Sequence, residues 1–361
     1  MWGAANAQTF SLGAVLPLSG NAAQVGQVAA AALRASAETL LGTGIKVKLS
    51  ILDSRSDARY AAAQAQTLTA AGVHALLCCE TARVAAQVVP ITAAAGVPTL
   101  SLAPVGEDGG YPFSLSATET QVLTKLALEG PQAPLVLMTP LGTTGDAAKK
   151  VLGGANIGVV RYPAQGAAPS TPLTPEALLA ATLEPGSVVL WDDAPGTLEA
   201  AEALTARGYS GVRVVRAEVW EALDAFGRAE LTGAVSVVSP AVLGYRLPDM
   251  HPAKARVSSF RRALRGVLFE SSAVATVTLA AGAWDAAQLL GAAAEQVLSY
   301  TAPTDLGEAA VRSALRDALI GLGPVDGVGG SYDFSAERAP GLLPESLVFA
   351  VWRGGRFFPF P

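Results

Sequence analysis

Two groups of residues at the ends of predicted strands could bind opposite charges. Thr81 precedes a helix that begins near Ala82 and Arg83, so free backbone N–H groups and a guanidinium would face the same crevice. Both features attract anions, and arginine can hold a carboxylate through two parallel hydrogen bonds. Glu218 follows the strand 212–215, where its carboxylate could meet an ammonium group. These residues suggest a zwitterion held between two halves of the chain; the alternative is ordinary surface charge.

Two further residue pairs follow strands, and each allows two interpretations. Asp192 and Asp193 come after the strand 188–191 and could hold a cation or act as acid and base, but an Asp at a helix start fits equally well. Cys78 and Cys79 could be a reactive or metal-binding pair, or two small residues that fill a strand end. Adjacent Cα atoms lie about 3.8 Å apart, below the usual disulfide range of about 4.4–6.8 Å. A bond between them would be strained, so we expect no structural disulfide framework.

The sequence offers no recognisable catalytic machinery. His74 opens a buried strand and His251 begins a helix, and neither has a partner at metal-ligand spacing. The sequence has no G-x-S-x-G, G-x-x-x-x-G-K-[ST] or H-E-x-x-H motif. The glycine clusters 106–110 and 327–330 do not join a strand to a helix, so we interpret them as loop or hinge glycines. We expect a binding protein without catalytic residues, cofactor or metal, and turnover of a bound compound would contradict this.

Composition and charge exclude several classes of protein. The 361 residues are 51% hydrophobic and 15% charged, which is typical of a folded chain of two domains. The net charge is −5, and Lys and Arg are scattered rather than clustered, so we expect no nucleic-acid partner. No window of about 20 apolar residues predicts a membrane span.

The elements that position these residues alternate between strand and helix. The first lobe begins with a strand at 12–16, and the period-two pattern of 45–51 predicts a strand at a sheet edge. Strands at 74–78 and 98–102 follow, separated by a helix at 82–95 that we expect to break near Pro90. Such alternation predicts βαβ units and a parallel sheet.

The pattern restarts after the Gly/Pro-rich stretch 104–112, which predicts a second α/β lobe. Its predicted strands are 135–138, 157–160, 188–191, 212–215 and 234–238, and its predicted helices are 145–152, 176–182, 196–207 and 220–226.

The last third of the chain does not form a third domain. It has helical patterns at 252–266, 271–299 and 305–320, with too few strands between them to build a sheet, so these helices must pack on the sheet of the first lobe. Residues 346–353, with Phe357 and Phe358, could form closing strands. We therefore predict an α/β fold of two doubly wound parallel-sheet lobes joined by a multi-segment hinge. Lobe 1 comprises 8–117 plus 250–327, and lobe 2 comprises 118–249 plus 328–361.

The N-terminus carries a possible processing site. Ala5-Asn6-Ala7 has the A-x-A form of a signal-peptidase site, so we interpret residues 1–7 as the end of a cleaved export signal behind a non-native Met1. An ordinary flexible N-terminus is the alternative.

The order of these segments resembles the branched-chain amino-acid-binding proteins of bacterial ABC importers, a family of the type I periplasmic binding proteins. The resemblance runs from Phe10 to Phe360. The segments that carry it are 12–20, Asp53 with Asp57, 88–91, 95–101, Trp284-Asp285-Ala286-Ala287, 329–334 and 352–357.

The resemblance implies a set of ligand-binding residues. It places the ligand carboxylate at Thr81, Ala82 and Arg83, and a second ligand loop at Ala103, Pro104 and Val105. In the other lobe it implies Thr144, Asp193 and Glu218, with Glu218 on the ligand ammonium.

This chain departs from the family pattern at several of these positions. Ala82 and Arg83 stand where hydroxyls are usual, Thr144 where a Tyr is usual, and Val25 where an aromatic is usual. A polar or acidic amino acid, or another small carboxylate, is therefore as good an expectation as a branched-chain amino acid.

The function implied by the resemblance is that of an extracytoplasmic solute-binding protein. Such a protein closes over its small-molecule ligand and delivers it to the membrane permease of an ABC importer. We expect a periplasmic monomer. The alternative is a periplasmic sensor or regulatory protein on the same fold, which would bind a partner protein instead of a permease.

Overall fold

The structure is a computed structural model, and it describes residues 8–40, 45–105, 110–131, 135–140, 143–152, 158–162, 186–269, 273–300, 307–335 and 340–361. The chain forms two compact units. Unit 1 comprises the described residues of Met1–Ala117 and Met250–Ser346; unit 2 comprises those of Thr118–Asp249 and Leu347–Pro361. Residues 1–7, interpreted above as the end of an export signal, and the predicted helix 176–182 lie outside the described residues.

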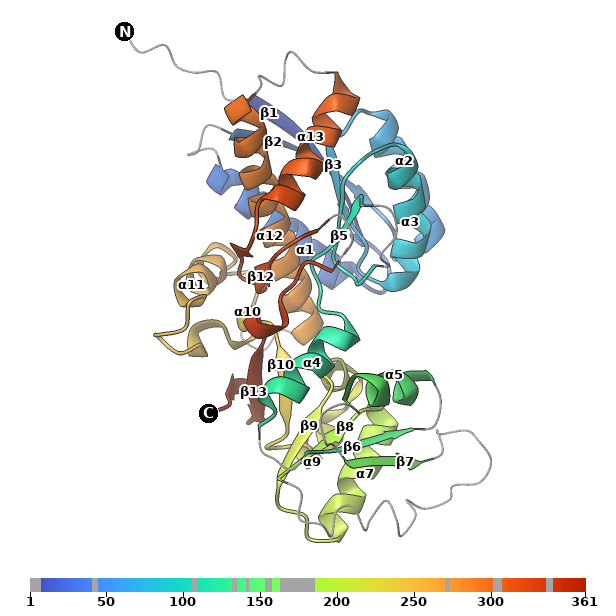
Figure 1. Cartoon of the computed structure of the whole chain (residues 1–361), viewed down its shortest axis with the longest axis vertical. Helices are drawn as coiled ribbons and strands as arrows, with labels where there is room; N and C mark the ends of the chain where they lie inside the picture. The colour runs from blue at the N-terminus through green and yellow to red at the C-terminus, as the bar shows by residue number, and fades with distance from the viewer. Residues whose placement is uncertain are drawn as a thin grey trace. The chain divides into compact units, whose positions relative to one another are not determined.

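Unit 1 is built on a parallel five-stranded sheet (Figure 1). Its strands, in spatial order, are β2 (Ile45–Asp53), β1 (Gln8–Leu16), β3 (Ala75–Cys78), β4 (Thr99–Ser101) and β5 (Pro112–Ser114). The prediction for β2 is confirmed: it lies at the sheet edge, and Lys46 and Lys48 are exposed there. The apolar strand β3 is buried throughout its length.

Helices cover both faces of this sheet. They are α1 (Ala23–Thr39), α2 (Ala58–Ala70), α3 (Ala82–Ala94), α11 (Lys254–Ala263), α12 (Val274–Tyr300) and α13 (Glu308–Gly321). The chain moves from β1 to the edge strand β2 and then back past β1 to β3. Right-handed crossovers therefore place α1 on one face and α2 and α3 on the other. In agreement, α2 packs against α3, while α1 packs against α12, which also contacts α13.

Two sequence predictions for unit 1 are wrong. The helix α3 does not break but continues through Pro90. The carbonyl of Ala86 loses its N–H partner there, but Ala86 and Pro90 are both exposed, so water can bind that carbonyl.

The second error concerns residues 328–346, which were assigned to the second lobe and belong to unit 1. The short strands β11 (Val325–Asp326) and β12 (Ser331–Tyr332) pair with each other, and Ser114 of β5 forms a bridge with Pro340. The carboxylate of Asp285 on α12 accepts hydrogen bonds from the N–H groups of Val328 and Gly329. These contacts keep the segment on unit 1 until Ser346.

Unit 2 is built on a seven-stranded sheet of the order β14-β13-β10-β9-β8-β6-β7 (Figure 1). Its strands are β6 (Leu135–Pro140), β7 (Gly158–Tyr162), β8 (Ser187–Leu190), β9 (Val212–Val215), β10 (Val235–Val238), β13 (Val348–Arg353) and β14 (Arg356–Pro359). Strands β6 to β10 pair in parallel, and the closing strands β13 and β14 add to them in antiparallel orientation.

The helices in the described part of unit 2 are mostly short. They are α4 (Glu119–Glu129), α5 (Thr143–Leu152), α7 (Ala194–Ala206), α8 (Val219–Ala222), α9 (Ala225–Glu230) and α10 (Pro240–Leu243). The predicted helix 220–226 is divided into α8 and α9, because Leu223 is extended and the Asp224 carboxylate caps α9 by accepting a hydrogen bond from the Gly227 N–H at 2.8 Å.

The fold class predicted from the sequence is confirmed: each unit is an α/β unit centred on a mainly parallel sheet. Within the described residues, no helix combines the length and the hydropathy needed to cross a membrane.

Candidate ligand site at the strand ends

In unit 1, the turn after β1 is held by one carboxylate. Asp53, at the end of β2, accepts hydrogen bonds from the N–H of Leu18 at 2.9 Å, the N–H of Ser19 at 3.1 Å and the hydroxyl of Ser19 at 2.6 Å. The N–H of Arg55 donates to the same carboxylate at 2.8 Å. Burial raises the pKa of Asp53, but these hydrogen bonds outweigh burial and lower the pKa below its usual value. Asp53 therefore stays ionised and orders this edge of the sheet.

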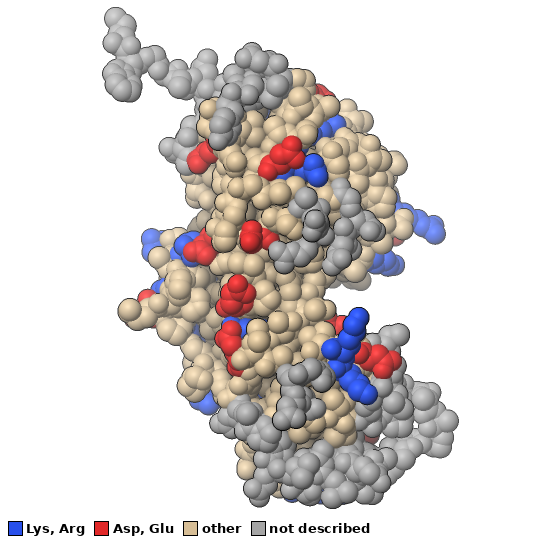
Figure 2. Space-filling model, viewed as in Figure 1, with Lys and Arg blue, Asp and Glu red and all other residues tan. Residues whose placement is uncertain are grey.

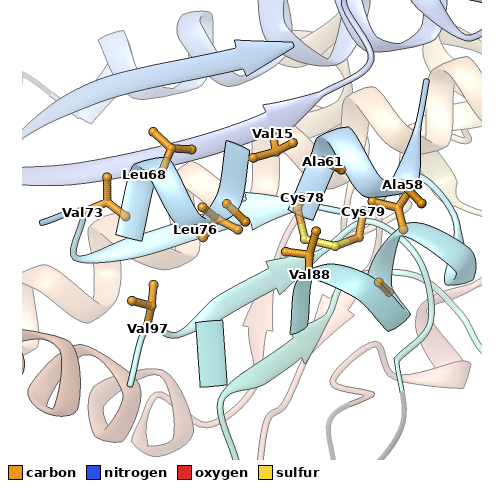
Figure 3. Packing of buried hydrophobic residues seen from close by; sticks show 13 residues of the cluster. Val15, Ala58, Ala61, Leu68, Val73, Leu76, Cys78, Cys79, Val88 and Val97 are labelled. Carbon is orange, nitrogen blue, oxygen red and sulfur yellow. A yellow bond between two sulfur atoms is a disulfide. The ribbon is translucent and has the colours of Figure 1, made fainter. Parts of the chain in front are cut away.

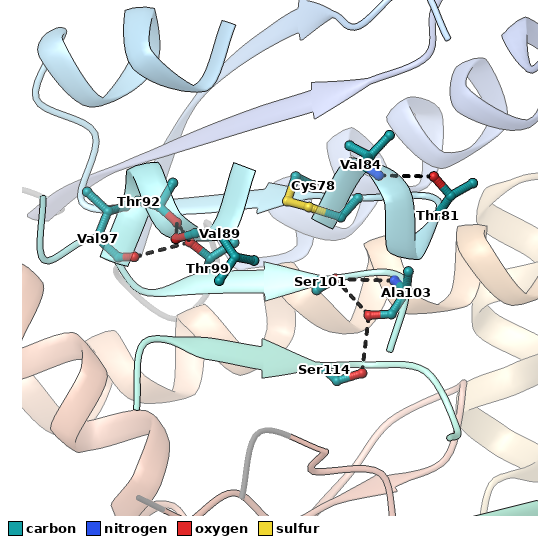
Figure 4. Close-up of a disulfide and its surroundings, with 11 residues drawn as sticks. Cys78, Thr81, Val84, Val89, Thr92, Val97, Thr99, Ser101, Ala103 and Ser114 are labelled. Carbon is teal, nitrogen blue, oxygen red and sulfur yellow. Dashed lines mark hydrogen bonds between the residues drawn. A yellow bond between two sulfur atoms is a disulfide. The ribbon is translucent and has the colours of Figure 1, made fainter. Parts of the chain in front are cut away.

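The end of β3 carries a disulfide between Cys78 and Cys79, which the sequence analysis did not expect (Figure 4). Cys79 has a φ of +75°, a left-handed conformation that lets adjacent side chains turn toward each other. Both cysteines are fully buried, in an apolar cluster with Ala61 and Val88 between the sheet and helices α2 and α3 (Figure 3). The interpretation of two small residues that fill a strand end holds for their packing; the expectation that the chain has no structural disulfide is wrong.

The helix α3 begins at Ala82, three residues after Cys79, and Thr81 caps its start. The hydroxyl of Thr81 accepts a hydrogen bond from the N–H of Val84 at 3.3 Å (Figure 4). Ala82 and Arg83 in the first turn are exposed. The N–H groups of Ala82 and Arg83 and the Arg83 side chain are therefore available to an anion at the carboxyl edge of the sheet.

The second predicted ligand loop follows β4. The carbonyl of Ala103 accepts hydrogen bonds from the hydroxyls of Ser101 at 2.7 Å and Ser114 at 3.3 Å (Figure 4). Ala103 is buried, Pro104 is exposed and Val105 is partly buried. The buried serine hydroxyls thus fix the loop beside the end of β3, where the N–H of Leu102 donates to the carbonyl of Cys78 at 2.9 Å.

Sequence reasoning missed Glu80, which stands between the disulfide and Thr81. Its Oε2 atom is buried and has no hydrogen-bond partner. Burial raises the pKa of Glu80 above its usual value, although a hydrogen bond with its own backbone and, to a smaller extent, the positive charge of Arg83 oppose the shift. The sequence signal was an acidic residue shortly after a predicted strand, the same signal that singled out Glu218.

In unit 2, Asp193 follows β8 and caps α7. Its carboxylate accepts a hydrogen bond from the N–H of Gly196 at 3.0 Å, while Asp192 accepts one from the N–H of Asp193 at 2.8 Å. This geometry favours the helix-start interpretation of the acidic pair. Within the residues that the structure describes, no group of three or more His, Cys, Asp or Glu side chains is arranged to hold a metal ion.

Glu218 follows β9 and lies beside a basic residue. Its carboxylate is 3.6 Å from Nε of Arg216, and the Glu218 side chain is 76% exposed. The Arg216 guanidinium lies 5.4 Å from the ring centroid of Trp191, which follows the neighbouring strand β8. Trp191 is buried and donates its indole N–H to Glu119. The buried indole of Trp191 thus contacts Glu119 at the start of α4 and lies near the Arg216 guanidinium, which in turn is paired with Glu218.

The remaining sequence-predicted residues have simple placements. Thr144 is in the first turn of α5, and its side chain lies outside the described residues. Nδ1 of His74 accepts a hydrogen bond from the N–H of Ser11 at 3.2 Å, and Nδ1 of His251 accepts one from the N–H of Ala253 at 3.1 Å. Each histidine therefore has a structural contact of its own.

Comparisons with known proteins agree with this architecture. A family model described as periplasmic binding protein matches residues 9–130. An ABC transporter substrate-binding protein from Desulfitobacterium hafniense, solved in complex with Leu, is similar at 17% identity and a TM-score of 0.71, covering 98% of this chain and 100% of that one.

Two further solved structures are similar over nearly the whole chain. An extracellular ligand-binding receptor from Rhodopseudomonas palustris has 16% identity and a TM-score of 0.68, covering 98% of this chain and 100% of that one. A leucine-binding protein from Thermotoga maritima has 14% identity and a TM-score of 0.63, covering 98% of each chain. No curated protein sequence matches this one.

Proposed function

We propose that this chain, which has the fold of the type I periplasmic binding proteins, captures a small carboxylate-bearing ligand outside the cytoplasm and delivers it to an ABC permease. The observation that carries the proposal is the extent of the likeness: 98% of the chain, including both units, aligns with a substrate-binding protein in complex with Leu. An amino acid is therefore the first ligand class to test. On this proposal the protein is a monomer and binds its ligand without transforming it.

The proposed site uses the strand ends of both units. In unit 1, the free N–H groups at the start of α3 and the Arg83 guanidinium would bind the ligand carboxylate. In unit 2, Glu218 would accept a hydrogen bond from the ligand ammonium. The proposed contacts are Thr81, Ala82, Arg83, Ala103, Pro104 and Val105 in unit 1, and Thr144, Asp193 and Glu218 in unit 2.

Ligand binding would drive the two units to close. A ligand held first by one unit gains contacts with the other only in the closed form, so it shifts the population toward that form. A ligand that binds with micromolar affinity supplies about 8 kcal/mol of binding free energy. That exceeds a closure cost of a few kcal/mol. The permease would recognise the closed, loaded form.

The charge distribution supports a small-molecule ligand over a nucleic acid. The net charge is −5, and on the described part of the surface in Figure 2 basic and acidic side chains are dispersed among uncharged residues. Among the described residues of the face shown in Figure 2, Lys and Arg form no continuous basic stripe of the kind that neutralises phosphates.

Calorimetric titration with a panel of amino acids tests the function. Native mass spectrometry of freshly purified protein would first reveal a retained ligand.

We expect Glu218→Ala to abolish amino-acid binding and to leave the thermal midpoint of the ligand-free protein nearly unchanged, because the side chain is 76% exposed. Glu221→Ala, on the exposed side of α8, is the matched control and should bind like the wild type. Unaltered affinity in Glu218→Ala would remove the ammonium role from Glu218.

The second candidate function is a ligand sensor on the same fold, supported by the likeness to an extracellular ligand-binding receptor. A sensor would bind a partner protein in its loaded form, whereas a transport protein would stimulate its permease. Genes for permease and ATPase subunits beside this one would favour transport. Cell fractionation, with the mature N-terminus sequenced, would test the proposed export and the removal of residues 1–7.

A further inference from the structure

The Cys78–Cys79 disulfide lies where the backbone turns from β3 to α3. Cys78 is the last residue of β3, and its carbonyl is held on the sheet by a hydrogen bond from the N–H of Leu102 at 2.9 Å. Cys79 then adopts a φ of +75°, and Thr81 is extended before it caps α3. The conformation of Cys79 therefore determines the direction in which the chain enters the first turn of α3.

The disulfide constrains Cys79 to this conformation. The left-handed region is unfavourable for a residue that carries a Cβ atom. In the described part of the chain, the backbone of Cys79 makes no hydrogen bond that would compensate for this. The bond to Cys78 closes a small ring around the peptide bond between the two residues. Reduction opens this ring and removes the covalent constraint on Cys79.

Burial determines when the redox state of the pair can change. Both cysteines are fully buried, and they pack in one apolar cluster with Val84, Ala85 and Val88 of α3 (Figure 3). A thiol or disulfide reagent reaches the two sulfur atoms only when this part of unit 1 opens. The redox state is therefore set while the chain folds, and the folded protein then retains it.

We propose that the Cys78–Cys79 pair is a redox switch for the start of α3. The oxidised form holds the first turn of α3 in place, and the reduced form releases it. The inference rests on the proposed function, because an exported chain folds where disulfides form, whereas the cytoplasm keeps thiols reduced. The chain thus gains its full ligand affinity only after export.

The switching step is thiol–disulfide exchange with a disulfide compound as the oxidant. One cysteine thiolate attacks the oxidant, breaks its S–S bond and releases one of its sulfurs as a thiolate. The second cysteine thiolate then attacks the mixed disulfide, forms the Cys78–Cys79 bond and releases the other sulfur. The two cysteine thiols lose two electrons and two protons, and the oxidant gains them and leaves as two thiols.

The test uses two double variants that lack the bond but differ at residue 79. Glycine adopts a positive φ without a steric penalty and alanine does not, so Cys78→Ala/Cys79→Gly keeps the turn and Cys78→Ala/Cys79→Ala loses it. Hydrogen exchange of the ligand-free protein follows the N–H of Val84, which donates to the Thr81 hydroxyl. Calorimetric titration with L-leucine and L-glutamate follows binding.

We expect the alanine variant to differ from the oxidised wild type in both measurements. Its Val84 N–H should exchange about five- to thirtyfold faster, and the amino acid that the wild type binds should bind more weakly by a similar factor, which is the population equivalent of the penalty on a left-handed residue. The glycine variant should stay within about threefold of the wild type in both. A role in packing alone predicts the reverse order, because glycine leaves the larger cavity.

The wild type provides a second measurement that needs no substitution at the pair. Wild-type protein refolded with a reductant should behave like the alanine variant and should recover after refolding with oxidised glutathione, whereas neither reagent should affect the glycine variant. Circular dichroism checks that each protein is folded. This comparison also decides the matter should a double variant fold poorly.

The outcomes separate the switch from the proposed function. Wild-type exchange and affinity in the folded alanine variant, or an equal loss in both variants, overturns the switch and leaves the binding function intact. A wild type that binds neither probe counts against the proposed amino-acid ligand. The exchange rates of Val84 then still decide whether the disulfide holds the start of α3.

Discussion

Asp285 accepts a hydrogen bond from the hydroxyl of Tyr332 at 2.9 Å. The same carboxylate accepts the N–H groups of Val328 at 2.8 Å and Gly329 at 2.7 Å, and all of it is buried. Asp285 lies in the middle of α12, so the three donors tie that helix to the segment that carries β11 and β12. Burial raises the pKa of Asp285 to about 6, against the effect of its hydrogen bonds.

This arrangement predicts a large loss of stability when the carboxylate is removed. Asp285→Ala leaves three buried donors without an acceptor and should lower the free energy of unfolding by about 3–5 kcal/mol. Tyr332→Phe removes one donor and should cost about 1–2 kcal/mol. Asp317→Ala, which removes an exposed partner of Arg316, should stay within about 1 kcal/mol of the wild type. Urea denaturation of the ligand-free protein measures all three, and an Asp285→Ala protein as stable as Asp317→Ala would contradict the structural role.

Glu80 predicts a pH dependence of stability. Burial raises its pKa in the folded protein above the usual 4.5, so the ionised form is disfavoured by folding. The penalty is absent below the unfolded pKa and grows as pH rises through the folded pKa. The free energy of unfolding of Glu80→Gln, relative to the wild type, should therefore rise between pH 4 and pH 7 in the absence of ligand. A constant difference across this range would show that Glu80 is not a buried charge.

Much of the fold could be predicted because hydrophobic periodicity reports burial. The apolar strands such as β3 and the alternating strand β2 were found from their patterns, as were long helices such as α12. Short elements gave too little signal: β5 has three residues and was missed. The break between α8 and α9 depends on one extended residue, Leu223, which no periodicity reveals.

The other differences come from contacts between distant residues. Residues 328–346 follow unit 1 because of hydrogen bonds to Asp285, which lies 43 residues from Val328 in sequence. The Cys78–Cys79 disulfide depends on a left-handed φ at Cys79, a conformation that sequence spacing does not indicate. For the candidate site, the residue types predicted that Thr81 precedes the start of α3. The hydrogen bond that Thr81 accepts from the Val84 N–H, the burial of the Glu80 Oε2 atom and the pairing of Glu218 with Arg216 required the structure.

The disulfide predicts the accessibility of the two thiols. Because Cys78 and Cys79 are fully buried and joined, a thiol reagent should find no reactive thiol in the native protein or in the denatured, unreduced protein. Two thiols should react after reduction in denaturant. A Cys78→Ala variant is the control, since its remaining cysteine should react on denaturation alone. Two reactive thiols in the unreduced, denatured wild type would contradict the bond.

The Arg216–Glu218 pair predicts a small and salt-sensitive coupling. Its 3.6 Å separation and the 76% exposure of the Glu218 side chain place it among surface ion pairs, which contribute about 0–1 kcal/mol. A double-mutant cycle of Arg216→Gln and Glu218→Gln should therefore give a coupling below about 1 kcal/mol that decreases at high salt, where exposed charges are screened. Arg216→Gln alone should lose somewhat more stability than Glu218→Gln, because its guanidinium also lies 5.4 Å from the Trp191 ring centroid and such a contact contributes about 0.5–1 kcal/mol. A coupling of several kcal/mol would mean that Glu218 is committed to Arg216, and it would then be a poor acceptor for a ligand ammonium group.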